Sequence, residues 1–319
     1  MNRSEHIERA TNSDFDLCII GGGASGAGCA LDAALRGLKV CLIEKEDFAA
    51  ATSSKSTKLI HGGVRYLEQA FKNLDFAQLK QVRHGLEERH TVLANAPHLA
   101  RPLALITPVF SWIEGLYFSI GLKIYAWFAS NKDTLPPSRW LSKRETLARI
   151  PTLNRKMHSS IMYYDGQLDD ARYTLALIQS AVEAGATVVN HLEVIGFEQA
   201  VGGTLEAVLL NDRLANDVGK QSLRVSSHLF LNCTGPYADP IRLMANPKMA
   251  ARIRPSKGVH VVLPYHVLNS DDALLIPKTP DGRVVFAIPF AHQLMLGTTD
   301  NDYTSIEQEP VLEATEVNF

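Results

Sequence analysis

The chain has 319 residues, of which 46% are apolar and 21% are charged, and its formal net charge is −2. These values are ordinary for a folded soluble protein, and the length predicts two domains. A net charge this close to zero excludes the global positive field by which strongly basic proteins attract nucleic acid, so we expect no nucleic-acid partner. Residues 1–13 are polar and mixed in charge, and they predict a flexible tail.

A glycine-rich turn follows the first predicted strand. The apolar residues 15–20 lead into Gly21, Gly23 and Gly26, and a second apolar strand at 38–43 ends on Glu44. In such a motif the first glycine permits a tight turn, the second lets backbone N–H groups approach a diphosphate, and the third lets the next helix lie close to the strand. An acid closing the second strand accepts hydrogen bonds from a ribose diol. The spacing therefore predicts a dinucleotide site.

Apolar periodicity and turn residues predict the remaining elements. Helices are expected at 24–36 and 171–184, each ending at a glycine, and at 76–95, where leucines and valine share one face. The block 101–167 lacks the alternation of strands and helices found before and after it, which indicates an inserted element. Strands are expected at 186–195, 205–210, 223–231, 258–263, 273–276, 284–288 and 294–298, with a hairpin turn at Asp281-Gly282.

This order of elements predicts an α/β fold with two interleaved domains. A Rossmann-like FAD/NAD(P)-binding domain is expected at 14–100 and 168–252, because its strands are nearly all apolar, as buried parallel strands are. A smaller antiparallel α+β substrate domain is expected at 101–167 and 253–319. Nicotinamide dehydrogenases usually keep the cofactor domain continuous, so the interleaving favours a different class of enzyme.

The four cysteines are Cys18, Cys29, Cys41 and Cys233. Three lie in the first strand–helix–strand unit, and the fourth ends a later apolar strand. Their spacing fits no metal site, so we predict no metal. We interpret them as reduced core thiols of a cytosolic protein.

One apolar segment, residues 109–129, raises the question of a membrane. A span needs about 20 predominantly apolar residues. Glu114 and Lys123 interrupt this segment, and a lysine near mid-span costs a few kcal/mol, so a transmembrane span is disfavoured. Two interpretations stay open: a helix packed inside the protein, or a helix that rests on a membrane surface.

Two motifs resemble the FAD-dependent glycerol-3-phosphate dehydrogenases of the aerobic respiratory type. The first is the glycine run from Gly21 to Gly28. The second is longer and runs from Ala51 to Glu68, with the sequence Ala-Thr-Ser-Ser-Lys-Ser-Thr-Lys-Leu-Ile-His-Gly-Gly-Val-Arg-Tyr-Leu-Glu. The resemblance covers nearly the whole chain from Asp14 onward and includes the segments at 96–99, 169–172, 232–236, 257–260 and 297–300.

The resemblance implies a flavoprotein of the D-amino-acid-oxidase-like class with FAD as its cofactor. Such an enzyme oxidises sn-glycerol 3-phosphate to dihydroxyacetone phosphate and passes the electrons to a membrane quinone. It implies a cytoplasmic protein, peripheral on the inner face of the cell membrane, and leaves a homodimer open. Family members continue past the position of Phe319, with a Gly-Val-Arg-Pro segment and a segment that closes the flavin site, so the chain resembles their N-terminal portion.

The same resemblance assigns the cofactor residues. The glycine turn meets the diphosphate, Glu44 the ribose, and the hydroxyl-rich stretch Thr52–Ser54 the diphosphate and ribityl chain. The segment Lys58–Gly62 is expected beneath the flavin ring, Val194 beside adenine, and a second phosphate-side turn at Thr234. The full predicted set is Gly21, Gly23, Ala24, Ser25, Gly26, Glu44, Lys45, Thr52, Ser53, Ser54, Lys58, Leu59, His61, Gly62, Val194, Thr234 and Gly235.

Arg65 and Tyr66 are the predicted substrate residues, because a guanidinium fork matches phosphate oxygens and a tyrosine adds one hydroxyl. Lys257 is a further candidate for the phosphate or for the N1 side of the flavin. His61 and His260 are candidate proton acceptors because histidine titrates near neutral pH. The predicted catalytic set is His61, Arg65 and His260.

Two other functions stay open on the sequence alone. The glycine motif also fits a different FAD-dependent oxidase that acts on an amine or a hydroxy acid, although the run from His61 to Tyr66 favours a phosphate substrate. The second possibility is a truncated, non-catalytic remnant whose flavin site never closes. Flavin absorbance of the purified chain separates the remnant from an enzyme.

Overall fold

The structure is a computed structural model that describes residues 2–63, 75–128, 135–215, 222–277, 279, 284–306, 308–313 and 316, with the side chains of 126–128 excepted. The chain divides into two compact units, which we describe separately. Unit 1 comprises Met1–Ser56, Asp170–Pro255 and Tyr303–Gln308, and unit 2 comprises Thr57–Asp169, Ser256–Asp302 and Glu309–Phe319. The predicted hairpin turn at 281–282 lies outside the described residues.

The boundary after Ser56 differs from the sequence-based one, which kept residues 57–100 with the dinucleotide domain. Strand β3 (Leu59–Ile60) pairs with β6 (Ser159–Leu168), and helix α4 (Phe76–Asn95) packs on β4 (Ala100–Val109) and β6. These contacts place the segment in unit 2. Interleaving itself is present as expected, because each unit is built from separate stretches of the chain.

Unit 1 contains, within its described residues, a six-stranded sheet in the order β7-β2-β1-β10-β9-β8. The first four strands in this order are parallel, and β9 and β8 continue the sheet as an antiparallel pair. The predicted strand at 186–195 is divided in two by a turn at His191, whose φ is +52°. The strands are β1 (Asp14–Ile20), β2 (Val40–Ile43), β7 (Thr187–Val189), β8 (Leu192–Gln199), β9 (Leu205–Asp212) and β10 (Leu223–Asn232).

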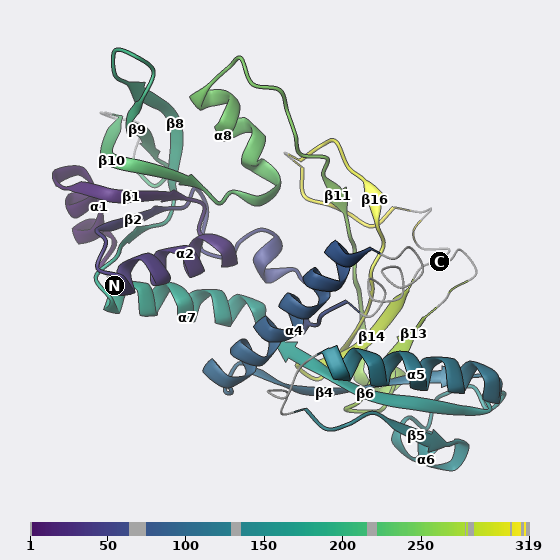
Figure 1. Ribbon diagram of the computed structural model, residues 1–319. Helices are drawn as coiled ribbons and strands as arrows, with labels where there is room; N and C mark the ends of the chain where they lie inside the picture. Colours follow the sequence, from purple (N-terminus) through teal and green to yellow (C-terminus); the bar gives the residue numbers. More distant parts are fainter. Residues whose placement is uncertain are drawn as a thin grey trace. The chain divides into compact units, whose positions relative to one another are not determined.

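Helices α2 (Ala24–Leu35) and α7 (Asp170–Glu183) lie side by side against the sheet of unit 1 (Figure 1). Alanines of α2 allow this close packing, and Ala27, Ala30 and Ile178 are buried with the strand residues beneath them. The helical predictions at 24–36, 76–95 and 171–184 agree with α2, α4 and α7 to within one or two residues. Unit 1 also contains the short helices η1 (Thr52–Ser54), η2 (Gly235–Tyr237) and α8 (Ala238–Ala245).

The prediction of a flexible tail was wrong for residues 3–12, which form helix α1 (Arg3–Asn12). The guanidinium of Arg3 makes two hydrogen bonds to the carboxylate of Asp212, at 2.7 and 3.1 Å, and reaches backbone carbonyls beside β7. His6 is buried, and its Nδ1 accepts the backbone N–H of Val188 at 3.0 Å. These partners are distant in sequence, so no local pattern reveals that the polar segment is anchored.

The sheet of unit 2 has eight strands in the part of the chain that the structure describes. Its order is β12-β15-β14-β13-β4-β6-β3, with β5 also paired to β6. The pairs are antiparallel, as predicted after Ile253, except that β13 runs parallel to β4. The strands not yet given are β5 (Arg139–Ser142), β12 (Val261–Pro264), β13 (Ala273–Ile276), β14 (Val285–Phe290) and β15 (Gln293–Gly297), with β11 (Ser256–Lys257) and β16 (Asn301–Asp302) as a separate pair.

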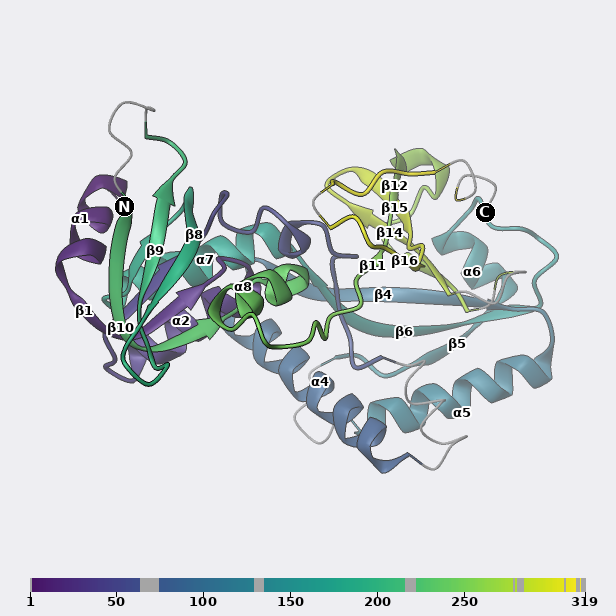
Figure 2. The same cartoon turned by 90° about the horizontal axis from the view of Figure 1, so that it is seen from above.

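Helices α4 and α5 (Trp112–Phe128) pack together and lie along β4 and β6 (Figure 2). Helix α5 buries Leu122 and Tyr125 and leaves a series of apolar side chains exposed to solvent. Among the described helices, none combines the length and the hydrophobicity that crossing a membrane requires. A capping box between Ser142 and Glu145 begins α6 (Lys143–Arg149), and η3 (Tyr265–Val267) follows β12.

Replacing Arg3 by alanine should lower the free energy of unfolding by about 1.5 kcal/mol, because it removes charge-assisted hydrogen bonds to a half-buried carboxylate. Burial opposes the charged form of Asp212, but Arg3 and backbone N–H groups outweigh it and lower its pKa. The stabilisation is therefore present above the unfolded pKa of about 4 and is lost as the pH falls through the folded value.

Urea denaturation at pH 7 and pH 3.5 measures both the loss of stability in Arg3→Ala and its dependence on pH. Arg9→Ala is the matched control, because Arg9 is on the same helix and exposed. An equal loss of stability in the two variants at pH 7, or a deficit in Arg3→Ala that does not shrink at pH 3.5, would contradict the role given to this ion pair.

Candidate functional site

The carboxyl ends of three parallel strands meet at one edge of the unit 1 sheet. Gly21 follows β1, Glu44 follows β2, and Cys233 and Thr234 follow β10. The backbone N–H of Cys233 donates to the carbonyl of Ile20 at 2.8 Å, which keeps the turns after β1 and β10 together. In open α/β sheets ligands bind outside the carboxyl ends of the strands, so this edge is the candidate site.

The turn after β1 requires glycine at two positions. Gly21 has a φ of +109°, and a Cβ there would lie 2.6 Å from the carbonyl oxygen of Cys233. A Cβ on Gly26 would overlap the carbonyl oxygen of Gly21. These approaches involve backbone atoms, which cannot move aside as a flexible side chain can. The first turn of α2 is therefore pressed directly against the end of β1.

The N-terminus of α2 is open toward solvent. Gly23 is its N-cap and has no side chain of its own to cap the helix. Ala24 and Ser25 are exposed, and the N–H of Ala24 donates to the hydroxyl of Ser53 at 2.9 Å. Helix N-termini bind anions through their N–H groups and partial positive charge. The structure thus brings Ser53, from the predicted hydroxyl-rich stretch, to the predicted diphosphate turn.

Glu44 is half-buried and holds the same turn from the other side. Its Oε2 accepts the N–H of Gly22 at 2.6 Å, and its Oε1 accepts the N–H of Glu46 at 2.8 Å. A carboxylate has about four lone-pair sites, so both oxygens keep the capacity to accept hydrogen bonds from hydroxyl groups. This geometry fits the predicted contact to a ribose diol.

The other predicted residues of unit 1 lie in different settings. The ammonium of Lys45 lies 4.6 Å from the ring centroid of Tyr237. Thr234 donates its N–H and its hydroxyl to Asn232 Oδ1, at 3.2 and 2.7 Å, and so its side chain is used within the turn. Val194 is buried in β8, so only its backbone is available to a ligand. Gly235 is exposed with a φ of +57°.

Unit 2 carries the predicted segment Lys58–Gly62. The sequence analysis did not predict which residues hold this segment in place. The buried N–H of Gly62 donates to the hydroxyl of Tyr125 at 2.7 Å, and this hydroxyl donates to Asp165 Oδ1 at 3.2 Å. Arg89 also hydrogen-bonds and ion-pairs with Asp165, and both charged side chains are almost fully buried. Sequence reasoning missed these three residues because they belong to three separate elements with no common motif.

Burial shifts the pKa values of two groups in this network, Asp165 and Tyr125. Burial raises the pKa of the Asp165 carboxyl, while the neighbouring Arg89 and His61 act against that rise. Burial and the adjacent Asp165 raise the pKa of Tyr125 well above its usual range, so its phenol remains protonated at neutral pH. A protonated phenol can accept from Gly62 and donate to Asp165 at the same time.

Two candidate catalytic residues of unit 2 have contrasting surroundings. His260 Nε2 lies 3.1 Å from the hydroxyl of Thr57, and burial, together with Lys58, lowers its pKa. A lowered pKa keeps the imidazole neutral near pH 7, as a proton acceptor requires. His61 is exposed and stacks with Phe286 at a centroid separation of 6.4 Å.

Lys257 is already paired. Its ammonium is buried and lies 2.9 Å from Glu313 Oε1 and 3.1 Å from Glu316 Oε2. A role in binding phosphate would require these carboxylates to be displaced. Arg65 and Tyr66 lie outside the described residues, so their assignment stays a prediction.

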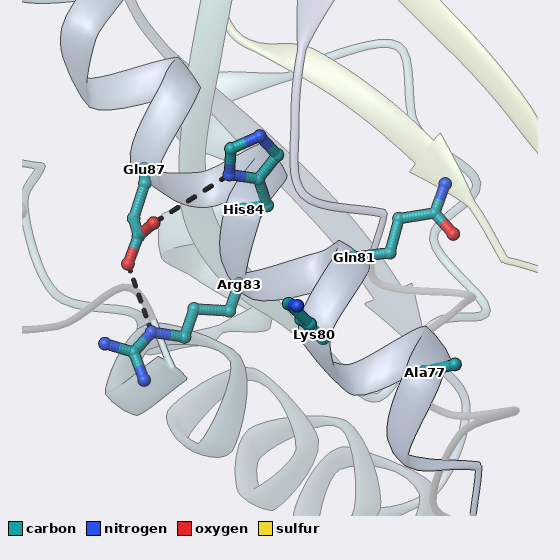
Figure 3. Close-up of a pocket in the computed structure, with 6 residues that line it drawn as sticks. All are labelled: Ala77, Lys80, Gln81, Arg83, His84 and Glu87. Carbon is teal, nitrogen blue, oxygen red and sulfur yellow. Dashed lines mark hydrogen bonds and ion pairs between the residues drawn. The ribbon is translucent and has the colours of Figure 1, made fainter.

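A shallow hollow along α4 is the subject of Figure 3. The side chains drawn there all come from this one helix, and Glu87 pairs with Arg83 at 3.1 Å and with His84 at 4.0 Å. Pairs at this spacing are ordinary on a solvated helix face. Among the residues that the structure describes, none of the predicted site residues lines the hollow, so we assign it no part in the chemistry.

The family model described as DAO, FAD dependent oxidoreductase, matches residues 16–318, so the chain belongs to the FAD dependent oxidoreductase family. The chain is 44% identical over 316 residues to the mitochondrial glycerol-3-phosphate dehydrogenase SDP6 of Arabidopsis thaliana, covering 97% of this chain and 49% of the relative. It is 41% identical over 309 residues to the mitochondrial glycerol-3-phosphate dehydrogenase of Homo sapiens, covering 96% and 42%. The chain thus spans about half the length of these relatives, and the resemblance drawn from its motifs is confirmed.

Solved structures agree with this fold. The glycerol-3-phosphate dehydrogenase from Bacillus halodurans, complexed with FAD, has a TM-score of 0.77 at 30% identity, covering 99% of this chain and 53% of that one. The L-alpha-glycerophosphate oxidase from Mycoplasma pneumoniae, with FAD bound, has a TM-score of 0.68 at 19% identity, covering 92% and 73%. The second likeness shows the fold alone. The predicted D-amino-acid-oxidase-like α/β fold is confirmed.

Adding one methyl group at Gly26 should destabilise unit 1 by about 3 kcal/mol or more, because the Cβ would collide with the backbone of Gly21. Gly28→Ala is the matched control: a Cβ at Gly28 meets nothing within 4 Å, and alanine favours the helix by up to about 1 kcal/mol. Thermal unfolding of both variants is the measurement. A Gly26→Ala protein as stable as Gly28→Ala would show that the first turn of α2 and the turn after β1 are not in close contact.

Proposed function

We propose that the chain binds FAD at the carboxyl edge of the unit 1 sheet and belongs to an enzyme that oxidises sn-glycerol 3-phosphate. The product is dihydroxyacetone phosphate, and the electrons pass from the reduced flavin to a membrane quinone. The observation that carries the proposal is the open N-terminus of α2 beside Glu44 and Ser53, in a chain whose relatives are named glycerol-3-phosphate dehydrogenases.

The residues at this edge fit FAD. Gly23 lets Ser53 approach the turn closely, since a Cβ there would lie 2.9 Å from Ser53 Oγ, and N–H groups of α2 supply donors for the charge of a diphosphate. The remaining lone pairs of Glu44 suit the ribose hydroxyls. When bound, FAD accepts a hydride from C2 of the substrate.

The chain's own residues supply orientation and proton transfer. His260, held neutral by burial, is our preferred acceptor for the proton of the substrate hydroxyl. Arg65 is our preferred phosphate ligand because a guanidinium makes two parallel hydrogen bonds to phosphate oxygens, and Tyr66 adds a hydroxyl. His61 is the second candidate acceptor. Lys257 ranks below Arg65, because Glu313 and Glu316 already hold its ammonium.

The cofactor proposal is tested by Gly23→Asp, which places a carboxylate where the diphosphate would bind. We expect the purified chain to retain FAD and the variant to lose at least nine-tenths of it, because like charges repel at the N-terminus of α2. Gly28→Asp carries the same charge on the same helix, away from its N-terminus, and should retain FAD. Flavin absorbance after gel filtration is the measurement, and equal flavin content in the two variants would count against the site.

The substrate proposal is tested by anaerobic bleaching of the bound flavin. We expect sn-glycerol 3-phosphate to reduce the flavin, and glycerol, glycine, proline and lactate to leave it oxidised at equal concentration. Bleaching by an amino acid or a hydroxy acid instead would favour the alternative oxidase. A folded chain that binds no flavin would favour the non-catalytic remnant.

We further propose that helix α5 rests on a membrane surface, as a peripheral enzyme that delivers electrons to a quinone would. The supporting observation is the apolar face that α5 presents to solvent. Such a face gains free energy when it enters the interface between lipid headgroups and acyl chains. The placement on the inner face of the cell membrane is part of this proposal. The exposed apolar side chains on or next to α5 are Phe110, Trp112, Ile113, Leu116, Tyr117 and Ile120.

The double variant Ile113→Asp/Ile120→Asp should bind anionic phospholipid vesicles at least tenfold more weakly than the unmodified chain. Each isoleucine gains up to about 2 kcal/mol on leaving water, and each new carboxylate is repelled by the lipid. Phe76→Asp changes a still more exposed apolar position on α4; it is the control and should change vesicle binding little. Co-sedimentation that is equal for all three proteins would remove α5 from the membrane contact.

A further inference from the structure

The four cysteines of the chain are free thiols that form two close pairs in unit 1. Cys18 and Cys41 face each other across β1 and β2 and are fully buried in the sheet. Cys29 and Cys233 are only partly buried. The two pairs therefore differ in access to solutes.

The second pair, Cys29 and Cys233, lies on two elements beside the candidate diphosphate turn. Cys29 lies on α2, one helical turn after Gly26, and Cys233 follows β10 directly. A Cβ on Gly26 would lie 3.4 Å from Cys233 Cβ, so the face of α2 that carries Gly26 and Cys29 is against this turn. Both cysteines pack against the same apolar cluster.

We propose that Cys29 and Cys233 form a peroxide-sensitive thiol pair, whose oxidation to a disulfide ties α2 to the turn after β10. A second part of the proposal, which rests on the proposed FAD site, is that this disulfide weakens dinucleotide binding. The oxidant is hydrogen peroxide. The buried pair, Cys18 and Cys41, stays reduced under the same conditions because peroxide does not reach it.

The chemistry is balanced with one molecule of hydrogen peroxide. The thiolate of one cysteine attacks a peroxide oxygen, the O–O bond breaks, and a sulfenic acid and hydroxide form. The second thiol attacks the sulfenic sulfur, the S–S bond forms, and the departing hydroxide takes up the thiol proton. Two thiols and one peroxide thus give one disulfide and two waters.

The thiol of Cys233 is a weak acid. Burial and the neighbouring Cys29 raise the pKa of the Cys233 thiol to about 11. Since the thiolate is the nucleophile, attack by Cys233 is slow at neutral pH and becomes faster as the pH rises toward that value. A slow reaction suits a pair that stays reduced under ordinary conditions and responds to sustained peroxide.

The consequence for the turn follows from its close packing. A disulfide brings the two sulfurs to about 2.05 Å, closer than any nonbonded contact between two thiols. The backbone of Cys233 already touches Gly21, and Gly21 already touches Gly26, so the strain of closing the bond passes into the glycine turn. The N–H groups of α2 then lose the alignment that a diphosphate requires.

The crosslink is tested on the full chain without any substitution. The reduced protein is treated with hydrogen peroxide at pH 7 and pH 9, catalase removes the peroxide, and free thiols are alkylated before peptide mass spectrometry. We expect Cys29 and Cys233 to lose alkylation together, faster at pH 9, in a peptide pair that dithiothreitol separates, while Cys18 and Cys41 remain alkylated. Independent oxidation of Cys29 and Cys233, or equal oxidation of the buried pair, would overturn the proposal.

The effect on the site is tested by FAD titration, followed by flavin fluorescence, before and after oxidation. We expect Kd to rise at least tenfold on oxidation and to recover with dithiothreitol, whereas Cys29→Ser and Cys233→Ser should bind FAD equally well with or without peroxide. Peroxide sensitivity that survives in both variants, or an oxidised protein with an unchanged Kd, would refute the coupling. If the reduced protein binds no FAD, the proposed function fails, and the alkylation result alone decides the thiol pair.

Discussion

The close backbone contact among the turn after β1, the first turn of α2 and the turn after β10 is the constraint on which the candidate site depends. Gly26 lies against the carbonyl of Gly21, and Gly21 lies against the backbone of Cys233. Because all three partners are backbone, none can rotate away to relieve a collision. The N-terminus of α2 is therefore held at the edge of the sheet by shape, and its N–H groups are oriented before any anion arrives.

Unit 2 depends on a different interaction, the buried ion pair between Arg89 and Asp165, which helps to hold the backbone of Gly62. Removing one partner of a buried ion pair leaves an uncompensated charge and costs about 3–5 kcal/mol, so Arg89 and Asp165 depend on each other. Tyr125 connects this pair to the backbone of Gly62. The position of Gly62 is thus fixed by helices α4 and α5 and strand β6, and not only by the short pairing of β3.

Local signals in the sequence were enough for elements whose cause is local. The spacing of glycines predicts the turn after β1, and the positive φ of Gly37 ends α2. Apolar periodicity predicts α4, which buries Val82 and Leu86. Helix α1 was missed because its stability comes from Asp212 and Val188, far along the chain. The boundary after Ser56 was missed for the same reason, since it depends on pairing between β3 and β6.

The site shows the same division between local and distant causes. The glycines and Glu44 lie at one edge of the sheet because the β–α–β motif fixes their geometry, whereas the partner of a charged side chain depends on the whole fold. Lys257 illustrates the second case. A buried ammonium is costly unless it is paired, and Glu313 and Glu316 satisfy that need.

A phosphate could replace those carboxylates only if they returned to water. The exposed fraction is 64% for the side chain of Glu313 and 4% for that of Glu316. Glu313 can therefore leave at little cost, but Glu316 also accepts a hydrogen bond from Asn301 at 2.7 Å and one from the N–H of Glu313 at 2.8 Å. Releasing Glu316 would leave these donors without their acceptor, so Lys257 is better suited to holding the chain around β11 and β16 than to exchanging ligands.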